Sequence, residues 1–344
     1  MTGLEVFMSR LRWQLVSFLG IAGLATLCSC GTQGQRVAGV GAEADAAFAA
    51  PAFGDPFWSH WGDGKAEMTG YDLRIPRYGE VRRGTAVAIF VTETFSQEDR
   101  VKADPGQHAA ADEFPVMKLN LVEDFPTGIY DYNVMTSSFL ALEPVVGRLP
   151  GSLTKVSYTS QEWCGHVYSQ LLFGGELQHT LHSYFDGEAD QQNTLPYPGA
   201  AVSEDALWFW ARGLAAPALA PGESIRVPLL PSLQRARFSH GNLAWRTATL
   251  SRAAQRVEVT VPAGTFPAEE LTVRIEPGPE GGEESRTFYV ETAAPRRIVS
   301  WEGSDGEFAE MLASERLSYW QMNGGEFVKE VQRLGLAPRP PKTP

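Results

Sequence analysis

The chain has 344 residues, of which 43% are hydrophobic and 20% charged, a composition typical of a globular protein rather than a largely disordered one. Its formal net charge of −12 argues against nucleic acid as a partner, because nucleic-acid binding depends on lysine and arginine side chains that neutralise phosphates. The same acidity argues against a protein that lies flat on an anionic bilayer.

The N-terminus has the layout of an export signal. Arg10 and Arg12 precede an apolar run from Trp13 to Leu27, and small residues follow. A run of about 15 residues is short for a membrane-spanning helix. We therefore predict a lipoprotein signal peptide over residues 1–29.

The segment Leu27-Cys28-Ser29-Cys30 resembles the bacterial lipobox, in which a leucine and a small residue precede the acceptor cysteine. From this likeness we predict that the Cys30 thiol is lipidated. Each buried methylene of an acyl chain would then contribute about 0.8 kcal/mol to membrane attachment. Gly31 follows the acceptor, which by analogy with enteric bacteria indicates the outer membrane. The predicted location is the cell envelope, lipid-anchored and facing the periplasm. The alternative is a cleaved secretory signal with incidental cysteines.

The remaining chain divides by composition. Residues 30–52 are rich in Ala and Gly and predict a flexible tether, and the Pro-rich residues 336–344 predict a disordered tail. Residues 53–335 form the predicted globular region, as one large domain or two intimately packed ones. Within this region Cys164 has no cysteine partner, so the fold depends on its core alone.

Strand patterns dominate the globular region. Gly84–Thr94, for example, is a β-branched and mostly apolar run bounded by Gly and by polar residues. The predicted strands are Glu67–Ile75, Gly84–Thr94, Pro115–Val122, Gly128–Leu140, Leu153–Ser160, Gly165–Phe173, Glu176–Phe185, Leu243–Leu250, Arg256–Pro262, Glu270–Ile275, Arg286–Glu291, Arg297–Trp301 and Ser314–Trp320. Short turns between them favour antiparallel pairing.

Two short helices are also predicted. Ser203 can cap a helix over Glu204–Arg212, whose Trp208-Phe209-Trp210 run indicates burial between layers or a lid. The second helix is Phe327–Leu334. The predicted fold is therefore mainly β: a large curved antiparallel sheet or partial barrel with one or two short covering helices.

Standard catalytic and metal-binding motifs are absent from the sequence. It contains no HExxH, no GxSxG and no CxxC. His179 and His182 are three residues apart, which on a strand places them on opposite faces, so they cannot hold one metal together. We predict no cofactor and no metal site.

The segment SQEWCGHVYSQLL (Ser160–Leu172) is the main candidate site. If it is extended, one side carries the polar set Glu162, Cys164, His166, Tyr168 and Gln170. We interpret this set as the lining of a ligand cavity. The catalytic alternative makes Cys164 a nucleophile and His166 its base, although about 6.5–7 Å of strand separates them. The structural alternative is a small buried cysteine beside a hydrogen-bonded histidine.

Several phrases resemble known groups of exported proteins. WGDGKAEMTGYDLRIPRYGEVRRGTAVAIFVTE, RVKADP, TGIYDYNVMTSSF, SQEWCGH and PRRIVSWEG, within residues 57–324, are similar to a bacterial exported family sometimes labelled "septum formation inhibitor Maf". That label does not fit, because the Ser-Pro-Arg of true Maf pyrophosphatases is missing. VPAGTFPAEELTV (Val261–Val273) resembles a hairpin of DUF3108-type envelope proteins. This likeness implies a curved sheet with an apolar concave side.

Together these features predict a membrane-anchored, non-catalytic periplasmic lipoprotein. We expect it to bind an apolar small molecule or an envelope protein and to contact the membrane through its lipid. The alternatives are a thiol-dependent hydrolase or acyl-transfer enzyme that uses Cys164 and His166, and a purely structural envelope protein.

Overall fold

The computed structural model describes residues 47–145, 147–278 and 282–338. The predicted signal peptide and Cys30 lie outside these residues. The helices are α2 (Asp55–Trp61), α3 (Leu207–Ala211) and α4 (Leu233–Ser239), with 3₁₀ segments η1 (Glu204–Ala206), η2 (Tyr319–Gln321) and η3 (Gly325–Leu334). The strands are β1 (Ala66–Arg77), β2 (Glu80–Ser96), β3 (Glu113–Thr127), β4 (Tyr130–Ala141), β5 (Leu153–Glu162), β6 (Gly165–Phe173), β7 (Glu176–Ser183), β8 (Gln191–Pro196), β9 (Val202–Ser203), β10 (Ser224–Leu230), β11 (Arg246–Arg252), β12 (Val257–Val261), β13 (Gly264–Ile275), β14 (Glu284–Glu291), β15 (Ile298–Gly303) and β16 (Phe308–Leu317).

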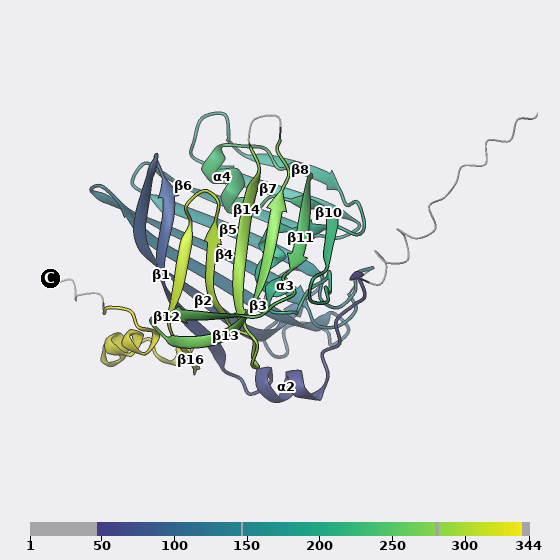
Figure 1. Ribbon diagram of the computed structural model, residues 1–344. Coiled ribbons are helices and arrows are strands. Elements are labelled where there is room, and N and C mark those ends of the chain that lie inside the picture. Colours follow the sequence, from purple (N-terminus) through teal and green to yellow (C-terminus); the bar gives the residue numbers. More distant parts are fainter. Residues whose placement is uncertain (1–46, 146, 279–281, 339–344) are drawn as a thin grey trace, which may run out of the picture. The chain divides into compact units, whose positions relative to one another are not determined.

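The strands form one open sheet in the order β8-β7-β6-β5-β4-β3-β2-β1-β16-β15-β14-β13-β11-β10-β9, with β12 paired to β13. Every pairing is antiparallel except that of β9 with β10. Sequence neighbours pair along most of this order, as short turns predict. The predicted fold class, mainly β with a large antiparallel sheet and a few short helices, is confirmed (Figure 1).

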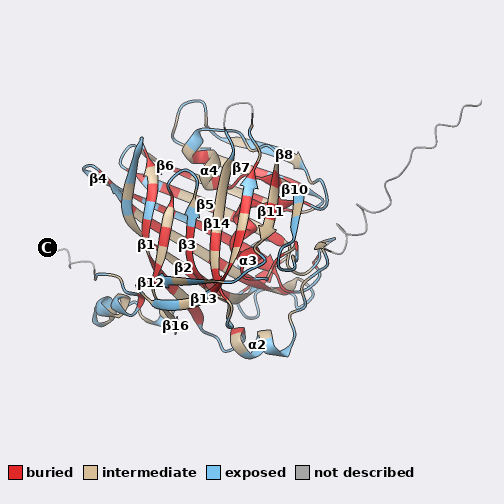
Figure 2. Cartoon of the chain, viewed as in Figure 1, coloured by how far each residue is buried: buried red, intermediate tan, exposed pale blue. Residues whose placement is uncertain are grey.

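Alternation along each strand decides which side chains enter the core. In β3 the inward positions are Leu119, Leu121, Glu123 and Phe125, and all four are buried. A carboxylate therefore occupies a place that the strand's pattern otherwise gives to apolar side chains. Figure 2 shows buried residues along the strands and exposed ones at the loops.

The sheet curls around its own helix. Trp208 of α3 packs edge-on against Phe288 of β14 and Trp301 of β15, with ring centroids 5.3 and 4.7 Å apart. The neighbouring Phe209 packs against Phe90 of β2 at 5.8 Å. Because β1, β15 and β16 lie between β2 and β14 in the sheet, one short helix contacts both sides only if the sheet is strongly curved. The aromatic run of α3 is therefore buried between layers, one of the two outcomes predicted for it.

The two ends of the sheet order also come together. The Trp245 indole before β11 donates a hydrogen bond to the Pro196 carbonyl at the end of β8, at 2.9 Å. Tyr197 and Trp245 pack edge to face beside this bond. The sheet remains unclosed, since no strand pairing joins β8 to β9 or β10.

Local signals explain most of the helices. The Ser203 hydroxyl accepts a hydrogen bond from the Asp205 amide at 3.3 Å, so the predicted cap is confirmed, although the segment begins as the 3₁₀ turn η1. The closing helix is present as a 3₁₀ segment rather than an α-helix. Helices α2 and α4 and strands β8 to β10 were not predicted. Among the described residues, no helix is long and apolar enough to cross a membrane.

The body begins earlier than the composition predicted. The Ala218 amide donates to the Ala47 carbonyl at 2.8 Å, and Phe48 packs against the main core. These residues belong to the predicted tether 30–52. Its last residues are therefore part of the folded region, because an aromatic side chain there gains from burial against the core.

Candidate functional site

Helix α4 covers one end of the curved sheet, here called the α4 end. The Phe238 carbonyl of α4 accepts a hydrogen bond from Arg77 of β1, and the Phe238 ring packs against Phe125 and Tyr132 of β3 and β4. Helix α2 lies at the other end of β1, where Trp61 packs near Phe90. Figure 1 shows α4 and α2 at the top and bottom of the view.

The sequence of α4 carries a weak but complete helix signal. Ser232 precedes it, and its hydroxyl accepts from the Arg235 amide at 3.1 Å, as an N-cap residue does. The following Leu-Gln-Arg-Ala-Arg residues favour a helix. His240 ends it in the left-handed conformation, with φ of 53°.

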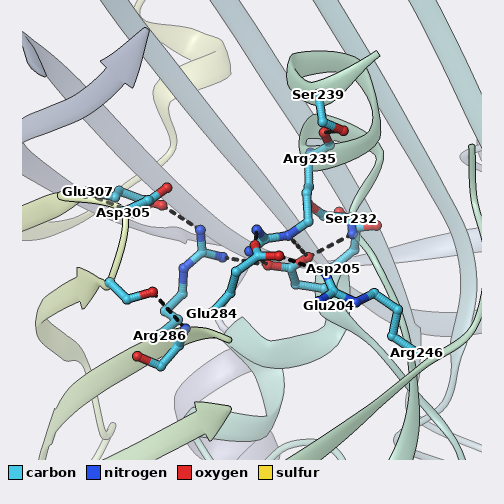
Figure 3. A network of polar contacts seen from close by, with 12 residues as sticks. Glu204, Asp205, Ser232, Arg235, Ser239, Arg246, Glu284, Arg286, Asp305 and Glu307 are labelled. Carbon is cyan, nitrogen blue, oxygen red and sulfur yellow. Dashed lines mark hydrogen bonds and ion pairs between the residues drawn. The ribbon is translucent and has the colours of Figure 1, made fainter. Parts of the chain in front are cut away.

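Two buried carboxylates hold the start of α4 in place. Glu204 accepts from the Ser232 amide at 2.9 Å, and Asp205 accepts from the Leu233 amide at 3.3 Å. Both acids come from η1, directly before the aromatic helix α3 that fills the core. The same short segment therefore fills the concave face and anchors the helix that covers it (Figure 3).

Arginine side chains pair with some of these acids. Arg235 donates to both oxygens of Glu204, at 2.6 and 2.8 Å, and also contacts Glu284. Arg286 contacts Glu307 from the other side. Burial acts to raise the pKa of Glu204, but the charge and hydrogen bonds of Arg235 outweigh it and lower the pKa to about 2.

Two other carboxyls have no such partner. Burial, and then the nearby Glu204 carboxylate, raise the pKa of Asp205 to about 7. Burial, and then the charge of Glu307, raise the pKa of Glu123 to about 8. Glu123 is 2% exposed, and its Oε2 has no hydrogen-bond partner among the described residues. At pH 7 Glu123 is therefore mostly protonated and Asp205 about half protonated, whereas an ordinary carboxyl is ionised.

Glu123 and Asp205 line a small cavity. Its volume of about 20 Å³ holds one water molecule at most. Thr136, Ser138 and Arg286 also line it. The cavity has room for a proton relay through water but none for an organic substrate.

A larger cleft opens beside α4, towards β6, β7 and β8. Its volume is about 360 Å³, and its lining includes Ser169, His179, Glu188, Arg237 and His240. The Ser169 hydroxyl and His179 Nε2 are 2.9 Å apart, and burial lowers the pKa of His179, which stays neutral at pH 7. No carboxylate hydrogen-bonds this imidazole among the described residues, so the pair satisfies buried polar atoms rather than forming a triad.

The candidate residues of the segment 160–172 lie at this same end but do not form one row. A tight turn at Trp163 and Cys164 separates β5 from β6, so the expectation of one extended strand is wrong. Cys164 lies exposed in that turn, and no hydrogen bond joins it to His166 among the described residues. The Cys164 amide donates instead to Glu162, at 2.6 Å.

The thiol is not activated. Its hydrogen bond to Glu162, then burial and the Glu162 charge, raise the pKa of Cys164, whereas a nucleophilic cysteine needs a lowered one. The structural alternative also needs correction, because Cys164 is exposed rather than buried.

The predicted cavity lining does not face one cavity: Glu162 at the end of β5 is buried, whereas the other four residues are not. In β6 the side chains of Val167, Ser169 and Leu171 are buried, while His166 is exposed and Tyr168 and Gln170 are partly so. Tyr168 donates to Gln170 at 2.8 Å on this outer face. None of the five predicted residues lines the α4 cleft. The interpretation of His179 and His182 is confirmed: His179 is buried and His182 is exposed beside Asp190.

Large apolar side chains are exposed at the turns around α4. Tyr78, Ile129, Trp163 and Tyr184 are 56, 84, 73 and 71% exposed, and we call them the tip row. They lie at the turns after β1, β3, β5 and β7, which adjoin because these strands are consecutive in the sheet. Tyr78 hydrogen-bonds Tyr132, while Trp163 stacks on Tyr130 of the neighbouring hairpin.

The centre of the concave face is filled. The side chains of α3 and the inward strand residues form one continuous buried core there. At this centre the protein's own aromatic residues occupy the volume that an apolar small molecule inside the sheet would need. Among the described residues no group of three or more His, Cys, Asp or Glu is placed to hold a metal ion.

Comparisons with known proteins do not show a family for this chain. No family model and no curated protein matches the chain. Among solved structures it is similar to a protein of YmcC-like fold from Bacteroides fragilis, thought to be exported, with 9% identity over 72% of this chain and 95% of that one. The TM-score of 0.21 is too low to support any inference from this likeness. The resemblances to exported and DUF3108-type families stay predictions.

Sequence reasoning missed the residues that make this end distinctive. Glu123, Arg235, Arg237 and Arg286 were not among the candidates. The available signals were the N-cap at Ser232 and a carboxylate at an inward position of β3. The packing of η1 against α4 depends on residues that are 28 positions apart, which local patterns do not reveal.

Proposed function

We propose that this chain is an exported, lipid-anchored envelope protein that binds another envelope protein through its α4 end. The anchor is the lipidated Cys30 predicted from the N-terminal sequence. The proposed binding is non-catalytic; in support, no hydrogen bond joins the exposed thiol to His166 among the described residues, and Glu162 raises its pKa.

The tip row is the observation that carries the binding proposal. Four large apolar side chains from separate turns are exposed at adjoining positions. Aromatic residues of this kind are enriched in protein interfaces and provide much of the binding energy. The chain's formal charge of −12 favours a protein partner over an anionic bilayer.

The α4 cleft gives the same end a means of specificity. Its volume of about 360 Å³ lies within the range of small binding sites, and it is lined by apolar residues together with Arg237 and His240. A protruding side chain of the partner can enter it.

Site-specific photo-crosslinking of the full chain in its own membrane tests the binding. A crosslinker in place of Ile129 should give one adduct of defined mass, which weakens when Trp163→Ser and Tyr184→Ser are added. Val328 is a matched control, because it is 46% exposed and lies on η3. No adduct from position 129, or an equal adduct from position 328, contradicts the proposal.

The anchor has its own test. Radioactive palmitate should label the full chain and not the Cys30→Ser variant, and the labelled protein should sediment with membranes. Equal labelling of both chains, or a wild-type chain that stays in the aqueous fraction, contradicts lipidation at Cys30.

A purely structural envelope role is the second candidate. The filled centre of the concave face favours it, because α3 and the inward strand residues form one continuous core there. It predicts that substitutions in the tip row leave both the adduct pattern and the envelope unchanged.

A further inference from the structure

Three cations gather at the end of β6 far from α4. Arg100 lies in the loop after β2, Arg148 in the loop after β4, and Lys155 in β5. Arg100 donates to the Phe173 carbonyl at 3.1 Å, and Arg148 donates to the next carbonyl, that of Gly174, at 3.2 Å. The two guanidinium groups thus converge on one turn.

Lys155 completes this group, which we call the cationic cluster. Its ammonium donates to the Arg100 carbonyl at 2.9 Å, and Arg100 donates again to the carbonyl of Thr154. All of these acceptors are neutral backbone oxygens. They orient the cations without neutralising them.

The cluster has no counter-ion of its own. None of the three side chains forms an ion pair with a described residue, although the chain has 41 acidic residues against 29 basic ones. Burial and then the charge of Arg148 lower the pKa of Arg100, and burial lowers that of Lys155. Partly buried cations are normally paired, so this arrangement is costly without an anion.

A cleft opens at Arg148. Its volume is about 540 Å³, and it is lined by Arg148, Ser152, Ser203 and several glycines of the surrounding turns. The Arg148 guanidinium lies over the rings of Phe173 and Tyr197, at 5.4 and 4.6 Å from their centroids. Its buried Nε has no hydrogen-bond partner among the described residues.

Of the three cations only Arg148 lines the cleft, and Arg100 lies on the adjoining carbonyl of the same turn. We propose that Arg148 binds a phosphate group in this cleft, with Arg100 and Lys155 adding positive charge nearby. A planar guanidinium group donates a pair of hydrogen bonds to phosphate oxygens, and neighbouring charge without a carboxylate favours an anion. The site is separate from the α4 end: Val167 lines the α4 cleft and Phe173 lines this one, and six residues of β6 span roughly 20 Å. A free phosphate and a lipid phosphomonoester offer the same chemistry.

Thermal unfolding of the full chain tests the site with inorganic phosphate as the probe. Phosphate should raise the Tm more than chloride at equal ionic strength, and Arg148→Gln should weaken the apparent affinity by about tenfold or more. Arg256→Gln is the matched control, because Arg256 is exposed and forms no ion pair with a described residue. Should Arg148→Gln fail to fold, Lys155→Gln, which removes a half-buried charge, should weaken binding several-fold.

Vesicle flotation separates the two sources. The Cys30→Ser chain, which has no acyl acceptor, is mixed with vesicles of phosphatidic acid in phosphatidylcholine, or of phosphatidylcholine alone. Flotation only with phosphatidic acid, lost in Arg148→Gln, assigns a lipid headgroup; a phosphate-dependent Tm without flotation assigns a free phosphate. No phosphate effect and no flotation, or equal effects in wild type and Arg148→Gln, overturns the proposal.

Discussion

The two ends of β1 bury ionic networks that balance their charges differently. At the α2 end, Glu67 accepts two hydrogen bonds from Arg212, at 2.7 and 3.2 Å, and both side chains are almost fully buried. At the α4 end, Arg235, Arg246 and Arg286 pair with Glu204, Glu284 and Glu307 but lie among more acids than they can neutralise. The buried carboxyls there are Glu123, Glu204, Asp205 and Glu307.

This difference in pairing decides which acids are ionised. Burial raises the pKa of Glu67, but the charge of Arg212 outweighs it and lowers the pKa to about 2. Asp205 and Glu123 are equally buried and keep raised pKa values of about 7 and about 8. A matched pair therefore holds the α2 end together at any physiological pH, whereas unmatched acids make the α4 end sensitive to pH.

The largest effect should come from breaking the matched pair. Arg212→Ala leaves Glu67 buried and unpaired and should lower the free energy of unfolding by about 3–5 kcal/mol. Urea unfolding of the full chain measures it. The double variant Glu67→Gln, Arg212→Met removes both charges and should recover much of the loss. A loss below about 1 kcal/mol in Arg212→Ala would mean that the Glu67–Arg212 pair contributes little to the stability of this end.

The unmatched acids should make stability depend on pH in the opposite sense to a paired carboxylate. The folded-state pKa values of Glu123 and Asp205 are raised, so their contribution is complete below the unfolded values and is lost as pH rises through about 7 and about 8. Unfolding curves at about pH 6 and about pH 9 should show this loss. Glu123→Gln, which is always neutral, should remain more stable than wild type by about 1–3 kcal/mol at the higher pH. An identical pH profile in both chains would contradict the claim that ionisation of Glu123 lowers the stability at high pH.

The cap of α4 should have a moderate and local effect. Ser232→Ala removes the hydroxyl that accepts from the Arg235 amide and should cost about 1 kcal/mol. Amide exchange should increase in α4 and remain unchanged in β1. Ser239→Ala is the matched control, because that exposed hydroxyl contacts only carbonyls within the helix.

The smallest effect concerns the exposed thiol. Cys164 should react with iodoacetamide more slowly than a free cysteine at neutral pH, because Glu162 raises its pKa. Glu162→Gln should increase the rate about threefold. A wild-type thiol that reacts faster than free cysteine would restore the thiol-enzyme alternative.

The sequence was informative about the sheet and much less so about the site. Strands such as β2 carry a local signal, a β-branched and mostly apolar run between Gly84 and polar residues, which is why their positions could be predicted. Helix α4 has only seven residues, and its stability depends on Glu204 and Asp205, which the sequence indicated only as first-turn acids of another helix. The predicted strands placed a break between Ser160 and Gly165, but the candidate row of residues ran across it, since the turn has no glycine or asparagine at its two central positions.

Hydrogen exchange of the full chain at about pH 6 and about pH 9, corrected for the intrinsic rate, compares the two ends directly. If the unmatched acids control this end, exchange at the higher pH should be faster in η1 and α4. Exchange should not change in the first residues of β1, around Glu67. Glu123→Gln should reduce the increase at α4. Equal protection of α4 at both pH values, or an equal loss at both ends, would contradict the claim that buried acids without partners distinguish the α4 end.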